Sequence, residues 1–253
     1  MRRPSAAVVV TGLLFGLPLV ALVVRAFADV WRAPALLPQR WGGRGFDAAF
    51  AGDDALPALL ASLGAGAVTT LLALVIAWPA ARVLGERRLH HPAPVFMLLA
   101  MPLLVPPYAV GLGLTEWFLR LGVTGTAAGL VLAHLAVVLP YTVLLLLSGF
   151  GPEIRGLEEM GRAAGLSGAE RLRWVTVPAL RPTLATAALV SFLVSWSQYG
   201  TSLAVAPEQP TLPVVLLPFV GADPQAAATL SLLFLAPAVL ALLAAVRAMK
   251  APA

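Results

Sequence analysis

The chain has 253 residues, 60% of them hydrophobic and 11% charged, with a mean hydropathy of +0.90 and a formal net charge of +5. Soluble domains carry roughly 25% charged residues, so the composition argues against a soluble protein and favours one that lies in a membrane. The lack of cysteine excludes disulfides, thiolate metal sites and a cysteine nucleophile, and the basic charge is typical of cytoplasmic membrane loops rather than of a nucleic-acid-binding protein.

Six long apolar stretches predict an all-α, polytopic membrane helix bundle, because a spanning helix needs about 20 mostly apolar residues. In chain order, the spans are expected from about Ala6 to Val24, Leu56 to Ala80, Val95 to Phe118, Thr126 to Phe150, Thr183 to Val205 and Gln225 to Val246. The first resembles a signal peptide, but its apolar run is too long and no clear cleavage site precedes Arg25. We therefore expect a retained first helix and a single transmembrane domain over residues 1–253.

Three further signals lie between the first span and the end of the third. The loop from Arg25 to Ala55 is too short for a separate domain. The pair His90-His91 lacks a metal-binding pattern, so no metal site is expected there. Prolines must interrupt or kink the third helix, and the break could serve a gate or be static packing; they are Pro102, Pro106 and Pro107.

The polar segment 151–182 separates the fourth and fifth spans and predicts two short helices outside the bilayer. Pro152 suits the first helical position, and Gly165 is a natural left-handed helix end. Ser167 with Glu170 three residues later forms a capping box. Pro178 is expected to end the second helix, because the residue before a proline disfavours α geometry. Four basic side chains should project from this segment: Arg155, Arg162, Arg171 and Arg173. The segment is either a solvated connection or a docking surface, and its built helices favour docking.

Polar side chains inside the spans are candidates for a translocation path, because such groups are expensive in hydrocarbon. At helical spacing Ser195, Gln198 and Ser202 share one face of the fifth span, and Tyr199 lies in the same run. His134 lies within the fourth span. The alternative for all of them is hydrogen bonding between packed helices, which is the stronger interpretation for the fifth-span residues and still more so for His134. No catalytic residues are expected.

The last loop and the charge distribution set the topology. Between Ala206 and Pro224 the apolar run Val214 to Leu217 is too short to span, and we expect it to dip toward the membrane or form a short surface helix. A cytoplasmic N-terminus places 12 of the 17 basic residues inside, which the positive-inside rule favours, so both termini are expected in the cytoplasm.

The spacing within segment 151–182 resembles the Glu-Ala-Ala loop of permease subunits of ATP-binding-cassette (ABC) importers. The pattern of that loop is Glu-Ala-Ala, three residues, Gly, nine residues, Ile-x-Leu-Pro. Glu159 and Gly165 match its Glu and Gly, while Met160 and Gly161 depart from its two alanines. A conservative match to its last part is made by Val175, Val177 and Pro178.

The resemblance implies a type I ABC importer permease fold in the bacterial cytoplasmic (inner) membrane, with multiple spans. The loop would form the coupling helix on a cytoplasmic ATPase, with contacts centred on Gly165, Leu166, Ser167 and Gly168. It also implies an ATPase dimer, a second permease subunit (a copy or a homologue) and an extracytoplasmic solute-binding protein docked near Trp41 and Pro213. ATP and Mg would belong to the ATPase, and no cofactor to this chain.

One observation supports a separate ATPase without reference to the family. A Walker-type phosphate loop needs a lysine after its glycines, and the sole lysine, Lys250, lacks that context. The solute is expected among iron, thiamine, polyamines and similar small solutes, with a preference for small cations. A secondary transporter or channel and an integral membrane enzyme are the alternatives, and the scattered acids and histidines make the enzyme the weakest.

Overall fold

The computed structural model describes residues 6–52, 54–86 and 93–250. The chain forms two compact units. Unit 1 comprises Met1–Leu59 and Leu212–Pro237, and unit 2 comprises Leu60–Thr211 and Ala238–Ala253. The pair His90-His91 lies outside the described residues.

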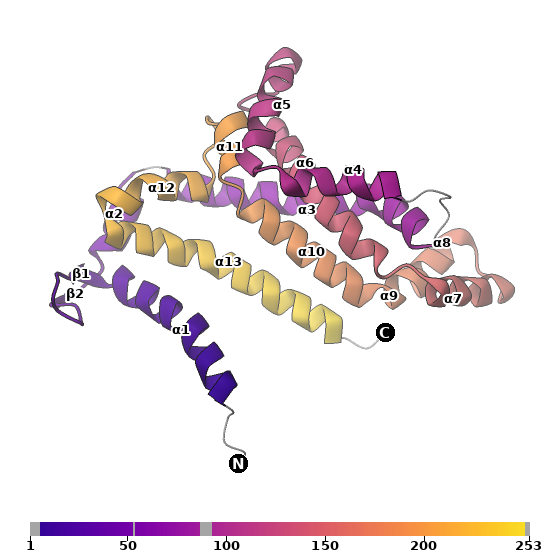
Figure 1. Cartoon of the computed structure of the whole chain (residues 1–253), viewed down its shortest axis with the longest axis horizontal. Helices are drawn as coiled ribbons and strands as arrows, with labels where there is room; N and C mark the ends of the chain where they lie inside the picture. Colours follow the sequence, from indigo (N-terminus) through magenta and orange to yellow (C-terminus); the bar gives the residue numbers. More distant parts are fainter. Residues whose placement is uncertain (1–5, 53, 87–92, 251–253) are drawn as a thin grey trace. The chain divides into compact units, whose positions relative to one another are not determined.

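Unit 1 combines apolar helices with a small β-ribbon (Figure 1). Its elements are α1 (Ala6–Ala26), β1 (Ala28–Val30), β2 (Arg40–Trp41), α2 (Arg44–Phe50), the start of α3 (Ala55–Gly85), α12 (Leu212–Ala222) and the first half of α13 (Pro224–Lys250). The strands are antiparallel, with Ala28 opposite Trp41. Among the described residues this ribbon is the departure from an all-helical chain. The apolar run Val214 to Leu217 lies within a short helix, α12, before the last span.

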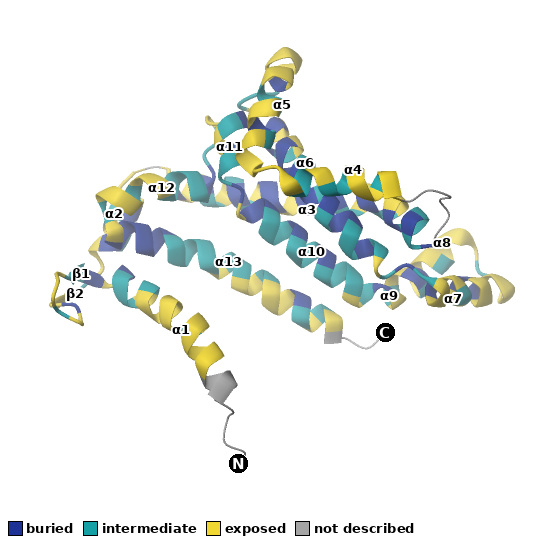
Figure 2. Ribbon diagram, viewed as in Figure 1, coloured by how far each residue is buried: buried dark blue, intermediate teal, exposed yellow. Residues whose placement is uncertain are grey.

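Unit 2 is built around α6 (Ala127–Leu147), which packs against α4 (Ala93–Leu104), α5 (Pro107–Leu121), α10 (Arg181–Trp196) and α11 (Gly200–Val205). The segment between α6 and α10 holds α7 (Pro152–Ala163), α8 (Gly168–Arg171), a π-helical turn η1 (Leu172–Thr176) and α9 (Val177–Ala179). Much of α6 is buried, whereas α1 is largely exposed along its apolar length, as a lipid-facing helix would be (Figure 2).

The structure supports three to five membrane spans within the described residues, fewer than the six expected. Three helices are long and apolar enough to cross a membrane without a break: Ala55–Gly85, Ala127–Leu147 and Pro224–Met249. Within α1, Val10–Ala26 is a shorter apolar helix. Two further candidates are bent pairs, Ala93–Leu104 with Pro107–Leu121 at 101° and Gly168–Ala179 with Arg181–Trp196 at 74°. The first bend confirms that prolines interrupt the third helix.

The expected continuous helix from Thr183 to Val205 is wrong, because α10 ends at Trp196 and α11 begins at Gly200. The cause lies in local competition for one carbonyl. The Ser197 hydroxyl and the Gln198 side-chain amide both donate to the Val194 carbonyl, at 3.1 and 3.2 Å. The Gln198 N–H therefore bonds three residues back, to Ser195 O at 3.2 Å. Side chains that compete in this way with the helix ladder favour its termination.

Candidate functional site

Helix α7 begins and ends where the sequence predicts. Gly151 occupies the N-cap and Pro152 the first turn. At the other end Gly165 has φ = +86°, in the left-handed region that glycine adopts without strain. Its N–H donates to Arg162 O and that of Leu166 to Gly161 O, both at 3.0 Å. These two bonds are the Schellman pair that satisfies the last carbonyls of a helix.

The capping box that starts the next helix is also confirmed. The Ser167 hydroxyl accepts from Glu170 N at 3.3 Å, and the Glu170 carboxylate accepts from Ser167 N at 2.8 Å. Hydrogen bonds from Ser167, first from its side chain and then from its backbone, hold the pKa of Glu170 below its ordinary value. The turn between α7 and α8 is therefore fixed by local hydrogen bonds, those of the Schellman pair on one side and those of the capping box on the other.

The prediction that Pro178 ends the second helix is wrong. Val177 keeps right-handed helical geometry (φ −64°, ψ −46°), the helix continues to Ala179, and the break falls at Leu180. The reason is the π-helical turn just before the proline, in which Val177 N bonds Leu172 O. A π-turn shifts the hydrogen-bond pattern by one residue, which removes the regular ladder that a proline ring would disrupt.

A buried carboxylate, Glu158, holds this segment together and was not predicted. Its Oε1 accepts from the Thr176 hydroxyl at 2.6 Å, and its Oε2 pairs with Arg82 of α3. Arg82 also pairs with Glu86 at 2.8 Å. A small cavity of about 70 Å³ adjoins this cluster. The signal was present in the sequence, because Ile154, Glu158 and Gly161 stand at helical spacing and form the buried face of α7.

The expected coupling residues divide into an exposed and a packed group. The exposed ones are Glu159, Gly165, Ser167 and Gly168. The packed ones are Gly161, which is buried, and the half-buried Leu166, Val175 and Pro178. Two exposed apolar side chains, Met160 and Trp174, add to the outer surface. The segment therefore has an inner face that shapes it and an outer face that is open to a partner.

The four arginines do not all project as predicted. Arg171 folds back, and its guanidinium donates to Leu166 O at 2.7 Å. Arg155 is exposed but donates to Glu86 O at 2.8 Å, and so ties α7 to the end of α3. The Arg173 guanidinium lies 5.0 Å from the ring centroid of Trp174. Arg162 is exposed, as expected.

The candidate translocation residues meet in a second, buried cluster. His134 of α6 lies 2.8 Å from the Ser195 hydroxyl through Nδ1 and 2.9 Å from that of Ser202 through Nε2. Because Ser202 donates its own proton to Gln198 O, it accepts from Nε2–H of the ring, and Nδ1 faces the Ser195 hydroxyl. Ser195, Gln198, Ser202 and His134 are buried, whereas Tyr199 is half-buried.

The breaks in two helices lie side by side next to this cluster, where α11 packs against α5. A Cβ at Gly200 would lie 2.9 to 3.0 Å from Tyr108 atoms, two of them backbone, so only glycine allows this approach. The Thr201 hydroxyl lies within hydrogen-bond distance of two acceptors, Gln198 Oε1 at 2.8 Å and Pro107 O at 3.2 Å. These contacts join the start of α5 to the start of α11.

Among the proteins similar to the chain are three from bacteria. ORF1 of Streptomyces antibioticus, assigned as an ABC transporter permease, is 33% identical over 177 residues, which cover 67% of this chain and 73% of ORF1. PhnV of Salmonella typhimurium, assigned as a 2-aminoethylphosphonate transport system permease, is 29% identical over 85% of this chain and 82% of PhnV. The molybdenum transport system permease ModB of Mycobacterium tuberculosis is 29% identical over 92% of this chain and 89% of ModB. No protein-family model matches the chain.

Permease subunits of this kind are multi-pass membrane proteins that carry neither a cofactor nor ATPase activity, and they work with a separate ATPase and a binding protein. The spanning helices of the present structure fit that description. On the strength of ORF1, which is above 30% identical and covered over more than two thirds of its length, the chain belongs to the ABC transporter permeases and is the membrane permease subunit of an importer.

Proposed function

We propose that segment 151–182 is the surface on which the ATPase docks and that it transmits ATPase closure to the spanning helices. The observation that carries the proposal is that one face of the segment is bound to α3, while the opposite face is exposed. Glu158, Thr176 and Arg82 bind it to α3 from within. Outward, Glu159 and the turn at Gly165 stay exposed. A surface held rigidly from behind can pass force to the helix it is bound to.

Gly165 offers the sharpest test of the docking role. A β-branched residue in the left-handed region is strained, so Gly165→Val should distort the turn, whereas Gly165→Asn should keep it, since asparagine tolerates that geometry. In proteoliposomes that hold the complete transporter, the Val variant should lose ATP-driven uptake while its helices stay folded by circular dichroism. Full uptake by the Val variant would contradict the docking role, and an equal loss of uptake in the Asn variant would point to steric contact at this position rather than to the shape of the turn.

We further propose six spans with both termini in the cytoplasm, in the type I importer arrangement. Support comes from the distribution of basic residues, 12 of 17 on the proposed inner side. The chain has no cysteine, so a single cysteine introduced at Arg247 or at Glu208 is its only thiol. Labelling of that thiol shows on which side of the membrane the residue lies. A membrane-impermeant maleimide should label Glu208→Cys in intact cells and Arg247→Cys only after permeabilisation. The reverse pattern would refute the orientation.

A second permease subunit, either a copy or a homologue, is proposed to pair with this one alongside an ATPase dimer. An apolar groove of about 460 Å³ in unit 2 supports the pairing, and its lining includes Ala185, Ala188, Ala241, Ala244 and Ala248. Small side chains let membrane helices approach closely. Replacing Ala188 with Leu should weaken the pairing of permeases in a purified complex, as read from the complex mass. An unchanged mass would place the contact elsewhere.

The translocation path is proposed to run beside the two helix breaks. Discontinuous helices in transporters expose backbone where a cavity satisfies it. Ser195, Gln198, Ser202 and His134 would hold the break in shape from within, and the half-buried Tyr199 would face the path. Tyr199→Ala should then change the apparent KM for the solute with little change in thermal stability, whereas a stability loss without a KM change would assign Tyr199 to packing.

The solute is proposed to be small and polar and to be delivered by the binding protein. The sequence resemblance favours iron, thiamine or a polyamine, while PhnV and ModB are named for 2-aminoethylphosphonate and molybdenum. These classes differ in charge, so ligand binding by the partner binding protein separates them. Tight binding of an oxyanion, and none of thiamine or spermidine, would reject the cationic group.

A further inference from the structure

The ribbon of unit 1 presents two apolar side chains at its tip. Leu36 is 91% exposed and Leu37 is 69% exposed. The loop that carries them is held by its own contacts. The Gln39 side chain bonds both the N–H and the carbonyl of Arg32, at 3.0 and 2.9 Å. The Trp31 indole N–H donates to Ala35 O at 3.0 Å. The two leucines are therefore displayed on a structured loop.

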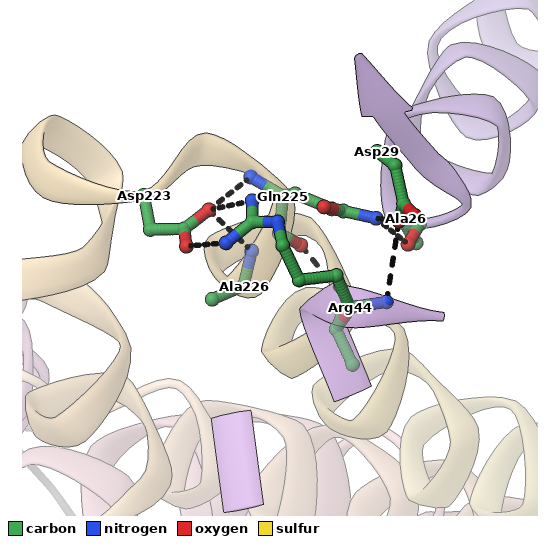
Figure 3. Close-up of polar contacts among 7 residues, drawn as sticks. Ala26, Asp29, Arg44, Asp223, Gln225 and Ala226 are labelled. Atoms are coloured by element: carbon green, nitrogen blue, oxygen red, sulfur yellow. Dashed lines mark hydrogen bonds and ion pairs between the residues drawn. The ribbon is translucent and has the colours of Figure 1, made fainter. Parts of the chain in front are cut away.

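The base of the ribbon is locked to the start of α13 by a network of charged groups (Figure 3). Asp29 accepts from the Gln225 amide at 3.0 Å and from Arg44 N at 3.2 Å. The Arg44 guanidinium donates from two nitrogens to the two carboxylate oxygens of Asp223, at 2.6 and 3.0 Å. Asp223 in turn accepts from the first backbone N–H groups of α13, those of Gln225 and Ala226. The ribbon is thus fixed at the end of α1 by groups on α2 and α13.

The ribbon segment itself carries a positive net charge, although Asp29 and Asp223 both line the cavity at its base. Between residues 25 and 44 the chain has four arginines and one acidic residue, Asp29, a net charge of +3. Arg40 and Arg44 pair with Asp29 and Asp223. The ion pairs found among the described residues include none for Arg25 or Arg32, and both line a cavity of about 350 Å³ with Trp31.

We propose that this ribbon is a binding module for anionic phospholipid, at the membrane surface where α1 ends. The ribbon starts two residues after α1, an apolar helix with exposed side chains such as Leu13 (61%), so it lies at the depth of the head groups. Leu36 and Leu37 enter the acyl region of that leaflet, and Arg25 and Arg32 bind the lipid phosphates. Tryptophan and arginine beside an apolar tip are the residues that anchor proteins at this interface.

The absence of cysteine allows a direct test with single spin labels in nanodiscs of the full chain. A label at Leu36→Cys is compared with one at Leu13→Cys, on α1, and one at Asp47→Cys, an exposed residue of α2. In an equal mixture of phosphatidylglycerol and phosphatidylcholine, the Leu36 label should be accessible to oxygen and shielded from a water-soluble nickel complex, as Leu13 should be. A Leu36 label as open to nickel as that at Asp47 would overturn the proposal.

The head-group contact is tested by lipid affinity. Each arginine near an anionic surface contributes about fivefold to binding, so the double variant Arg25→Gln/Arg32→Gln should bind phosphatidylglycerol about 30-fold more weakly in native mass spectrometry. The control is Arg120→Gln, an exposed arginine paired with Glu116 in unit 2, which should keep wild-type affinity. An equal loss in the control would overturn the proposal. So would shielding of Leu36 that appears only when the binding protein is added, because the tip would then be a protein contact.

Discussion

Replacing Glu158 with alanine should loosen segment 151–182 without unfolding the membrane helices. The Glu158 side chain is 10% exposed, and it joins the Thr176 hydroxyl to Arg82. A hydrogen bond to a charged group contributes about 1.5–3 kcal/mol. The Thr176 hydroxyl keeps a longer contact to Arg171 O at 3.3 Å, and Arg82 keeps Glu86 and is 31% exposed. The loss of the bond between Thr176 and Glu158 therefore sets the cost of local opening, in the upper part of that range, at about 2–3 kcal/mol.

Hydrogen exchange measures this free energy directly, because a local opening of lower free energy exchanges faster. Since about 1.4 kcal/mol is a factor of ten, amides of α7 and of the turn Leu172–Thr176 should exchange about 30- to 160-fold faster in Glu158→Ala. Amides of α6 should be unchanged. The matched control is Glu159→Ala, the exposed neighbour, whose effect on exchange should stay within 0.5 kcal/mol, or about twofold. Unchanged exchange in Glu158→Ala would refute the view that this carboxylate anchors the segment.

Close contacts at three other positions predict measurable effects on stability. Gly161→Ala should stabilise α7 by up to about 1 kcal/mol, since the new Cβ would lie 3.4 Å from Leu166 Cδ1 and complete the Schellman contact; a lower melting temperature would contradict this. Gly200→Ala should destabilise unit 2 by about 1–3 kcal/mol through overpacking against α5, and unchanged thermal stability would disprove the close approach. The pKa of Asp223 is lowered to about 2, first by the Arg44 hydrogen bonds, so this group stabilises unit 1 above about pH 4, and that contribution is lost as pH falls toward 2. Asp223→Asn should remove this pH dependence of the melting temperature between about pH 4 and 2. A plot of melting temperature against pH identical to that of the wild type would disprove it.

Local signals in the sequence predict the ends of α7 and the start of α8 well, because caps depend on residues within one turn. Pro152, Gly165, and Ser167 with Glu170 all take their expected places. The long apolar runs likewise predict α3, α6 and α13, because span length depends only on bilayer thickness. These features need no knowledge of tertiary contacts.

The features that the sequence did not predict depend on distant or competing partners. The burial of Glu158 requires Arg82, 76 positions earlier in the chain. The break after Trp196 requires both the competition for the Val194 carbonyl and the approach of α11 to Tyr108 at Gly200. A helical projection that treats Ser195, Gln198 and Ser202 as one continuous face misses that break, although His134 still brings Ser195 and Ser202 together.

The π-helical turn Leu172–Thr176 holds one residue more than an α-helical turn would place between the same flanking residues. Deleting one residue within it should therefore restore α-helical pairing, while the residues on either side keep their helical phase. Thr176 should still face Glu158, but Pro178 would meet the carbonyls of a regular helix. A deletion of one residue at this turn would thus strain the helix at Pro178 and leave the rest of the connection into α10 in place.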